Sequence, residues 1–147
     1  MTTYVAAELR RLVAERAKHL CEYCLIHEED TYLGCQVDHI IAEKHGGPTT
    51  PENLAFACTF CNRAKGTDIG SIAPSTGEFT RFFNPRTDHW SDHFLLNEVL
   101  IVARTSIGEV TLNILDLNQS ERIQERQLLA ELGSYPPELD PMWDNES

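Results

Sequence analysis

The chain has 147 residues, a length that fits one domain with a core of modest size. Its formal net charge of -11 argues against a protein that coats nucleic acid through bulk electrostatics, because neutralising phosphates takes clustered lysine and arginine. Charged side chains interrupt the first apolar stretch, so we expect neither a signal peptide nor a membrane span there, and we predict a cytoplasmic protein.

Hydrophobic periodicity predicts four elements in the first half of the chain. Apolar residues at helical spacing predict a helix over residues 4–18. The β-prone run at residues 36–41 predicts a short strand, and residues 54–57 predict a second one. A short helix is expected over residues 58–65, because Gly66 supplies a stop directly after it.

The second half of the chain predicts a hairpin and a helix. Residues 70–85 are rich in turn formers and predict no regular element. The β-branched runs at residues 99–103 and 109–115 predict two strands joined by a turn at 106–108. Residues 120–132 have the apolar spacing of a helix.

Four of the five cysteines form two CxxC pairs, Cys21 with Cys24 and Cys58 with Cys61. In a reducing compartment such pairs are better explained as thiolate ligands than as disulfides. Four thiolates fill the tetrahedral shell of Zn²⁺ and leave no open position, so we predict a structural zinc site. A redox dithiol would need a strand before the CxxC and a parallel sheet around it, which the sequence does not predict. The remaining Cys35 is more often a small buried apolar residue than a fifth ligand.

Between and within the two CxxC pairs lie three further segments: VDHII at residues 37–41, PENL at 51–54 and CNRAKG at 61–66. Together with the cysteines they resemble the HNH endonuclease family in its zinc-containing form. The resemblance covers about residues 21–66. It departs from the nominal motif at Asn62, which stands where many relatives have the last histidine, so the chain resembles an HNN variant.

The resemblance implies an α+β fold with a ββα-metal core, in which a hairpin packs on a short helix. Added to this core are an N-terminal helix and a C-terminal β-hairpin plus helix. We therefore expect a single HNH domain over residues 1–135, with its core at 21–66 and a C-terminal extension at 67–135. Residues 136–147 are predicted to be a loosely ordered acidic tail.

Phosphodiester hydrolysis explains the residue types of the motif. A histidine with an ordinary pKa of about 6.5 can take a proton from water near neutral pH, which makes His39 the candidate general base. A hard cation such as Mg²⁺ or Mn²⁺ needs oxygen ligands, and the resemblance assigns these to Asp38 and Asn62. The plain alternative is that Asp38 and His39 only satisfy hydrogen bonds and that Asn62 only caps a helix.

Three further residues of the motif receive supporting roles from the resemblance. Asn53, the middle residue of the motif, would pin the loop between the strands and orient the base. Arg63 and Lys65 would face the phosphates of the nucleic-acid backbone, with Arg63 the better bidentate partner.

Two functions of different classes are therefore expected. The first is a metal-dependent endonuclease that hydrolyses DNA. Its expected substrate is double-stranded DNA bound with weak intrinsic affinity, with a protein partner to supply targeting. The second is a catalytically silent, zinc-stabilised module that binds nucleic acid or protein. The acidic charge favours the second function, whereas the set formed by Asp38, His39 and Asn62 favours the first.

Overall fold

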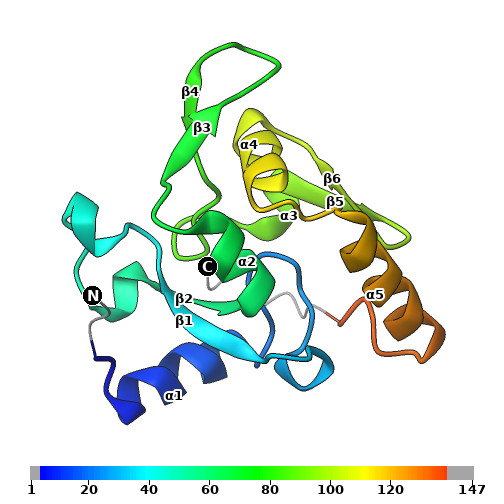
Figure 1. Cartoon of the computed structure of the whole chain (residues 1–147), viewed down its shortest axis with the longest axis horizontal. Coiled ribbons are helices and arrows are strands. Elements are labelled where there is room, and N and C mark those ends of the chain that lie inside the picture. The colour runs from blue at the N-terminus through cyan, green and yellow to red at the C-terminus, as the bar shows by residue number, and fades with distance from the viewer. Residues whose placement is uncertain (1–3, 139–147) are drawn as a thin grey trace.

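The computed structural model describes residues 4–138. Within them the chain forms helices and three two-stranded antiparallel sheets, so the predicted α+β class is confirmed (Figure 1). The helices are α1 (Ala7–Arg16), α2 (Thr59–Lys65), α3 (Trp90–His93), α4 (Ser106–Ile114) and α5 (Ser120–Glu131). The strands are β1 (Cys35–His39), β2 (Leu54–Cys58), β3 (Gly70–Ile72), β4 (Phe79–Arg81), β5 (Phe94–Asn97) and β6 (Leu100–Ala103).

Strands β1 and β2 form the hairpin on which helix α2 packs. Asp38 lies opposite Ala55 and His39 opposite Leu54, and every residue of β2 is buried. Helix α2 begins directly after β2 and ends at Gly66, whose φ of +53° is unfavourable for other residues. The predicted ββα arrangement is therefore present.

Helix α1 also packs against the β1–β2 hairpin, through a small apolar cluster. Val13 and Ala17 are fully buried there with Leu54, while Phe56 is 5% exposed. Arg16 adds two hydrogen bonds from its guanidinium to the carbonyls of Pro51 and Leu54. The helix begins three residues later than predicted, at Ala7, and its N-cap position is an alanine without a side-chain cap.

The extension contains the predicted hairpin, but one of its strands was assigned wrongly. Residues 109–115 lie in helix α4 and the turn after it, and the partner of β6 is β5, formed by Phe94–Asn97. The β-branched run is compatible with a strand, yet Thr105 caps a helix by accepting a hydrogen bond from the amide of Gly108. Gly108 also lies so close to the His93 carbonyl that a Cβ there would approach its oxygen to 2.2 Å. Cap and close packing outweigh the strand propensity.

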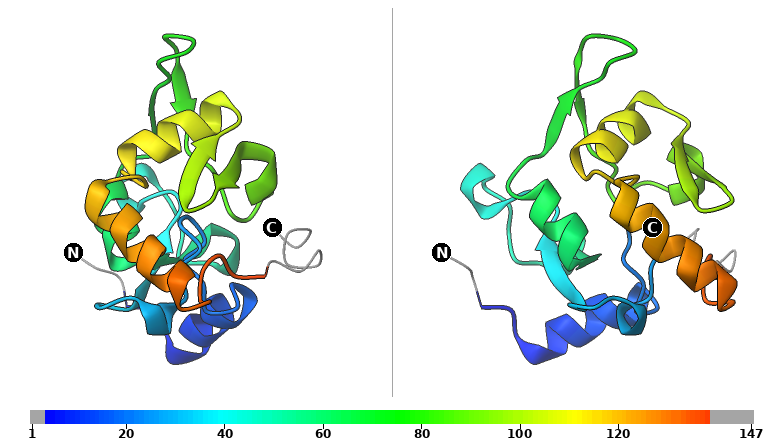
Figure 2. Two further views of the ribbon diagram at one scale, coloured as in Figure 1. Left: turned by 90° about the vertical axis from the view of Figure 1, so that its right-hand side faces the viewer. Right: turned by 45° about the vertical axis from the view of Figure 1, so that its right-hand side comes forward.

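Strands β3 and β4 lie in the segment that was predicted to have no regular structure. They form a hairpin that projects from the rest of the molecule (Figure 2). The base of this hairpin is tied to the following turn, because Arg81 forms an ion pair with Asp88.

The main cluster of buried residues runs from Cys21 to Tyr135 and joins the predicted core to its extension. The indole of Trp90 donates to the Tyr23 carbonyl, and the Tyr135 hydroxyl donates to the Cys24 carbonyl. The final residues of the predicted acidic tail, 139–147, lie outside the described residues. Among the described helices, none has the length and apolar character needed to cross a bilayer.

Candidate metal centre and motif residues

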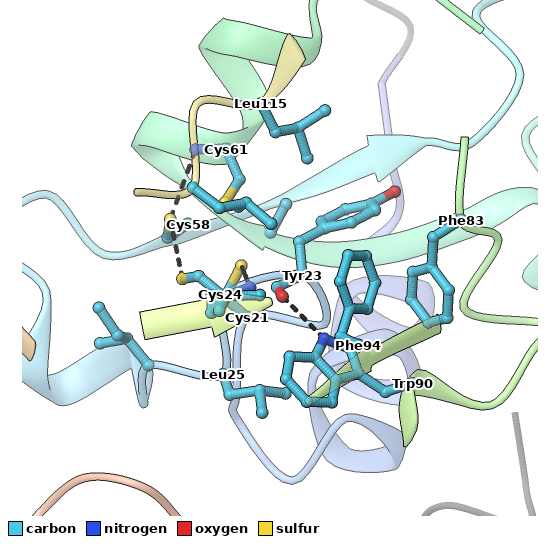
Figure 3. Close-up of a cluster of buried hydrophobic side chains, with 14 of the residues drawn as sticks. Cys21, Tyr23, Cys24, Leu25, Cys58, Cys61, Phe83, Trp90, Phe94 and Leu115 are labelled. Carbon is cyan, nitrogen blue, oxygen red and sulfur yellow. Dashed lines mark hydrogen bonds between the residues drawn. The ribbon is translucent and has the colours of Figure 1, made fainter. Parts of the chain in front are cut away.

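Four cysteines converge in one buried cluster (Figure 3). Cys21 and Cys24 lie in the loop after α1, Cys58 ends β2, and Cys61 lies in the first turn of α2. Their sulfur atoms all lie within 4.8 Å of one another, and Cys24 Sγ is 3.7 Å from Cys58 Sγ. Sulfurs placed tetrahedrally about 2.3 Å from a zinc ion would be separated by about 3.8 Å. The donor set and its size therefore fit Zn²⁺, as predicted.

The two-residue spacing lets each CxxC loop turn back on itself. The Cys24 amide lies 3.5 Å from Cys21 Sγ, and the Cys61 amide lies 3.4 Å from Cys58 Sγ. In both loops the sulfur of the first cysteine thus accepts a hydrogen bond from the backbone amide of the second cysteine. The fifth cysteine, Cys35, lies opposite Cys58 in the hairpin and is outside the four-sulfur cluster. Burial raises the pKa of the Cys35 thiol.

Asp38 is buried in the interface between β1 and α2. Its carboxylate accepts a hydrogen bond of 3.3 Å from the Tyr23 hydroxyl and lies 3.2 Å from the Lys65 ammonium. The same ammonium donates to the His39 carbonyl at 2.9 Å. Burial raises the pKa of Asp38 above its ordinary value, although the Lys65 charge opposes this. The carboxylate of the motif is therefore already paired with a buried cation.

Asn62 lies in the same interface. Its side-chain amide donates to Gln36 Oε1, and Gln36 is two residues before Asp38 on the same face of β1. Asn62 and Lys65 are three residues apart on α2, so they share one face of that helix. The donation by the amide nitrogen leaves Oδ1 of Asn62 as the oxygen that could bind a cation. A carboxylate and an amide oxygen, the ligand types of Mg²⁺, thus belong to one interface.

Lys65 was expected to face the phosphates of nucleic acid, and this expectation is wrong. Its side chain is 1% exposed. The ammonium forms an ion pair with Asp38 and a hydrogen bond to the His39 carbonyl. The CNRAKG pattern gave no indication of this, because a lysine at the end of a short helix is normally solvated. Arg63, by contrast, is exposed and lines a hollow of ≈ 280 Å³ together with Phe60.

His39 is the last residue of β1 and is half-buried. Alternation along the strand turns its ring away from the face of Asp38. Its Nε2 lies 2.9 Å from the Thr49 hydroxyl, in the loop that joins β1 to β2. The structure therefore brings Asp38 and Asn62 into one interface and holds His39 separately against this loop.

Asn53 anchors the loop between β1 and β2. Its side-chain oxygen accepts from the Ile41 amide, and its side-chain nitrogen donates to the carbonyls of Ile41 and Pro48. Gly47 is needed for this packing, because a Cβ there would lie 1.7 Å from the Ile41 carbonyl oxygen and 2.8 Å from Asn53 Nδ2. The clamp encloses the turn that leads to Thr49.

Sequence reasoning did not find Tyr23, Gln36 and Thr49 as neighbours of the motif residues. Each lies ten or more positions away from its partner in the sequence. Only for Gln36 was a signal available, because it lies two positions before Asp38 on a predicted strand and must share its face.

A four-cysteine cluster whose size fits zinc lies beside a ββα unit. This combination identifies the protein as a metal-binding ββα domain. Comparison with known families agrees: residues 21–68 match the HNH endonuclease family. The segment contains all four clustered cysteines as well as Asp38, His39, Asn53 and Asn62.

One curated relative is the Septu protein PtuB of Bacillus thuringiensis, which is 26% identical over 129 residues. The alignment covers 82% of this chain but 45% of the relative, so the chain spans less than half the length of that protein. No solved structure matches the chain.

Proposed function

We propose that this chain is a metal-dependent endonuclease that hydrolyses DNA phosphodiester bonds. In this proposal His39 is the general base, and Asp38 and Asn62 hold a divalent cation, Mg²⁺ or Mn²⁺. The observation that carries the proposal is the match of residues 21–68 to the HNH endonuclease family, together with the shared β1–α2 interface of Asp38 and Asn62. When bound, the cation supplies neutralisation of the phosphate and of the departing oxygen.

His39 needs one ring nitrogen held and the other free to take a proton. When Nε2 donates to the Thr49 hydroxyl, Nδ1 carries the lone pair that can accept a proton from water. Asn53 supports this arrangement indirectly, because it anchors both ends of the turn before Thr49. His39 and Asp38 are consecutive and point to opposite faces of β1, so the proposal requires the phosphate to bind at the end of the strand, where both faces can be approached.

The Asp38 carboxylate must be shared between Lys65 and a cation. Lys65 favours the charged form of Asp38 and so opposes the effect of burial, which raises the pKa of this ligand. The same ion pair weakens the attraction of Asp38 for a divalent cation. We therefore expect cation binding that is weak in the free protein and strengthened by the phosphate of the substrate.

Binding to DNA is proposed to depend on a few contacts. Arg63 is the motif residue that is free to reach phosphate, and the net charge of -11 limits affinity for DNA. We propose that a protein partner supplies targeting.

The proposal is tested by incubating supercoiled plasmid with the zinc-loaded protein and Mg²⁺ or Mn²⁺. Wild type should relax or linearise the plasmid, and His39→Ala should reduce the rate by about 10²-fold or more. His27→Ala is the control, because the His27 ring accepts a hydrogen bond from the Glu29 amide and from no residue of the motif. Equal cleavage by wild type and His39→Ala would refute the role of His39.

The alternative is a zinc-stabilised binding module without catalysis. The observation in its favour is that the Asp38 carboxylate is already paired with Lys65. Such a module would bind duplex DNA or a protein, yet leave plasmid intact in the presence of either cation.

A further inference from the structure

Arg122 of helix α5 points into the cysteine cluster from outside the segment matched by the HNH family. Its side chain is buried at 3% exposure. One guanidinium nitrogen, Nη2, lies 3.0 Å from Cys61 Sγ and 3.6 Å from Cys58 Sγ. A buried guanidinium is thus in hydrogen-bonding distance of two of the four sulfurs.

The hydrogen bonds to sulfur are distributed in a regular way. Backbone amides within the CxxC loops donate to Cys21 and Cys58, the first cysteine of each pair. Cys61, the second cysteine of its pair, receives its hydrogen bond from Arg122. The CxxC loops thus provide an N–H to sulfur hydrogen bond for two of the sulfurs. Arg122 provides one for a third.

The shape of arginine allows this contact to be held firmly. While Nη2 donates to the sulfurs, Nη1 donates to the Leu115 carbonyl at 3.1 Å, and the guanidinium carbon lies 5.8 Å from the centre of the Phe60 ring. The two ends of the fork are thus occupied by different partners, which a lysine with one nitrogen could not reproduce.

We propose that Arg122 stabilises the zinc-bound form of the cysteine cluster. Four thiolates outweigh the two positive charges of Zn²⁺, so the loaded cluster carries a net negative charge inside the protein. Arg122 balances that charge, retards loss of zinc and lowers the reactivity of the Cys58 and Cys61 sulfurs toward oxidants. The inference depends on zinc at the four cysteines and not on nuclease activity.

Helix α5 also supplies a matched control. Arg126 lies one helical turn after Arg122 and is fully buried, and its guanidinium donates to the carbonyls of Val99 and Leu117 and to Asn118 Oδ1. It holds the extension together through oxygen acceptors only. Arg126→Gln should therefore destabilise the fold without removing a hydrogen bond to sulfur.

The test compares zinc-loaded wild type, Arg122→Gln and Arg126→Gln at a temperature well below the melting temperature of each. Transfer of zinc to a chromogenic chelator should be roughly 10-fold faster for Arg122→Gln than for the other two proteins. Reaction of the thiols with hydrogen peroxide should be accelerated in the same variant. Equal rates for the two variants would overturn the proposal, because a general loosening of the fold would then explain both.

A spectroscopic measurement separates thiolate contact from packing. In Co²⁺-substituted protein, loss of a hydrogen bond to sulfur should shift the thiolate-to-cobalt charge-transfer band in Arg122→Gln and leave it unchanged in Arg126→Gln. If Arg122→Gln does not fold, Arg122→Lys keeps the charge but not the two-ended fork, and its band and zinc-transfer rate should lie between those expected for Arg122→Gln and wild type. A wild-type band and transfer rate in a folded Arg122→Lys protein would also overturn the role of the fork.

Discussion

The ammonium of Lys65 lies 3.2 Å from the carboxylate of Asp38, although the two side chains are only 1% and 4% exposed. Removing one partner of a buried ion pair leaves an uncompensated charge, which costs about 3–5 kcal/mol. Lys65→Met should therefore lower the melting temperature of the zinc-loaded protein. Added Mn²⁺ should restore part of the loss, because a cation bound by Asp38 would replace the missing ammonium.

The control for this prediction is Lys44→Met, since Lys44 is exposed in the loop after β1. Its melting temperature should follow that of wild type with and without Mn²⁺. If Mn²⁺ raises the melting temperature of Lys65→Met no more than that of wild type, Asp38 does not bind the cation.

Thr49 is expected to orient the ring of His39 through the 2.9 Å contact with Nε2. Thr49→Val keeps the shape of the side chain but removes the hydroxyl. We expect kcat for plasmid cleavage to fall by roughly 10-fold with little change in KM, because the proton acceptor is misoriented while substrate contacts persist. Thr50→Val is the control, since the side chain of the neighbouring Thr50 does not cap the short 3-10 turn Pro51–Asn53 that follows it. Identical kinetics for the two variants would rule out positioning by Thr49.

Asn53→Asp tests the loop clamp. The aspartate keeps the acceptor for the Ile41 amide but loses both hydrogen bonds donated to the carbonyls of Ile41 and Pro48. Two lost hydrogen bonds and a carboxylate facing carbonyl oxygens should reduce the free energy of unfolding by about 2–3 kcal/mol. Denaturant unfolding measures this loss, and Asn113→Asp on the exposed side of α4 should show almost none of it.

The ion pair of Arg81 with Asp88 predicts a pH dependence of stability. Burial raises the pKa of Asp88, but hydrogen bonds from Arg81 and the Asn84 amide outweigh this effect and place the pKa below the ordinary value of 3.8. A lowered pKa in the folded state stabilises the protein above pH 3.8, and this contribution is lost as the pH falls through the lowered pKa.

Asp88→Asn should therefore melt below wild type at neutral pH, and the difference should shrink below pH 3.8. Comparing the two proteins at each pH removes effects that both share, such as acid release of zinc. A difference that stays constant across this range would show that Asp88 acts through its shape and not through its charge.

The sequence was sufficient to predict the parts of the site that depend on local spacing. Two CxxC pairs, two short strands and a glycine stop after Lys65 led to the cysteine cluster and the ββα unit. These features are predictable because each is determined within a few residues of the chain.

The sequence was insufficient wherever a contact joins distant segments. Residues 109–115 have strand propensity, but Thr105 and the His93 backbone select a helix. Lys65 has the composition of a surface residue, but the buried Asp38 carboxylate draws it inward. Nothing near Arg122 indicates sulfur partners, because Cys61 lies 61 positions earlier in the chain.

The interlocking of the extension with the cysteine loops bears on how this protein can be divided. Trp90 and Tyr135 hydrogen-bond to the carbonyls of Tyr23 and Cys24, and Phe83 packs edge-on against the Tyr23 ring. A fragment cut after Asp68 would retain every motif residue yet uncover this apolar surface. Moving the motif residues into another protein would therefore also require other residues to cover this apolar surface.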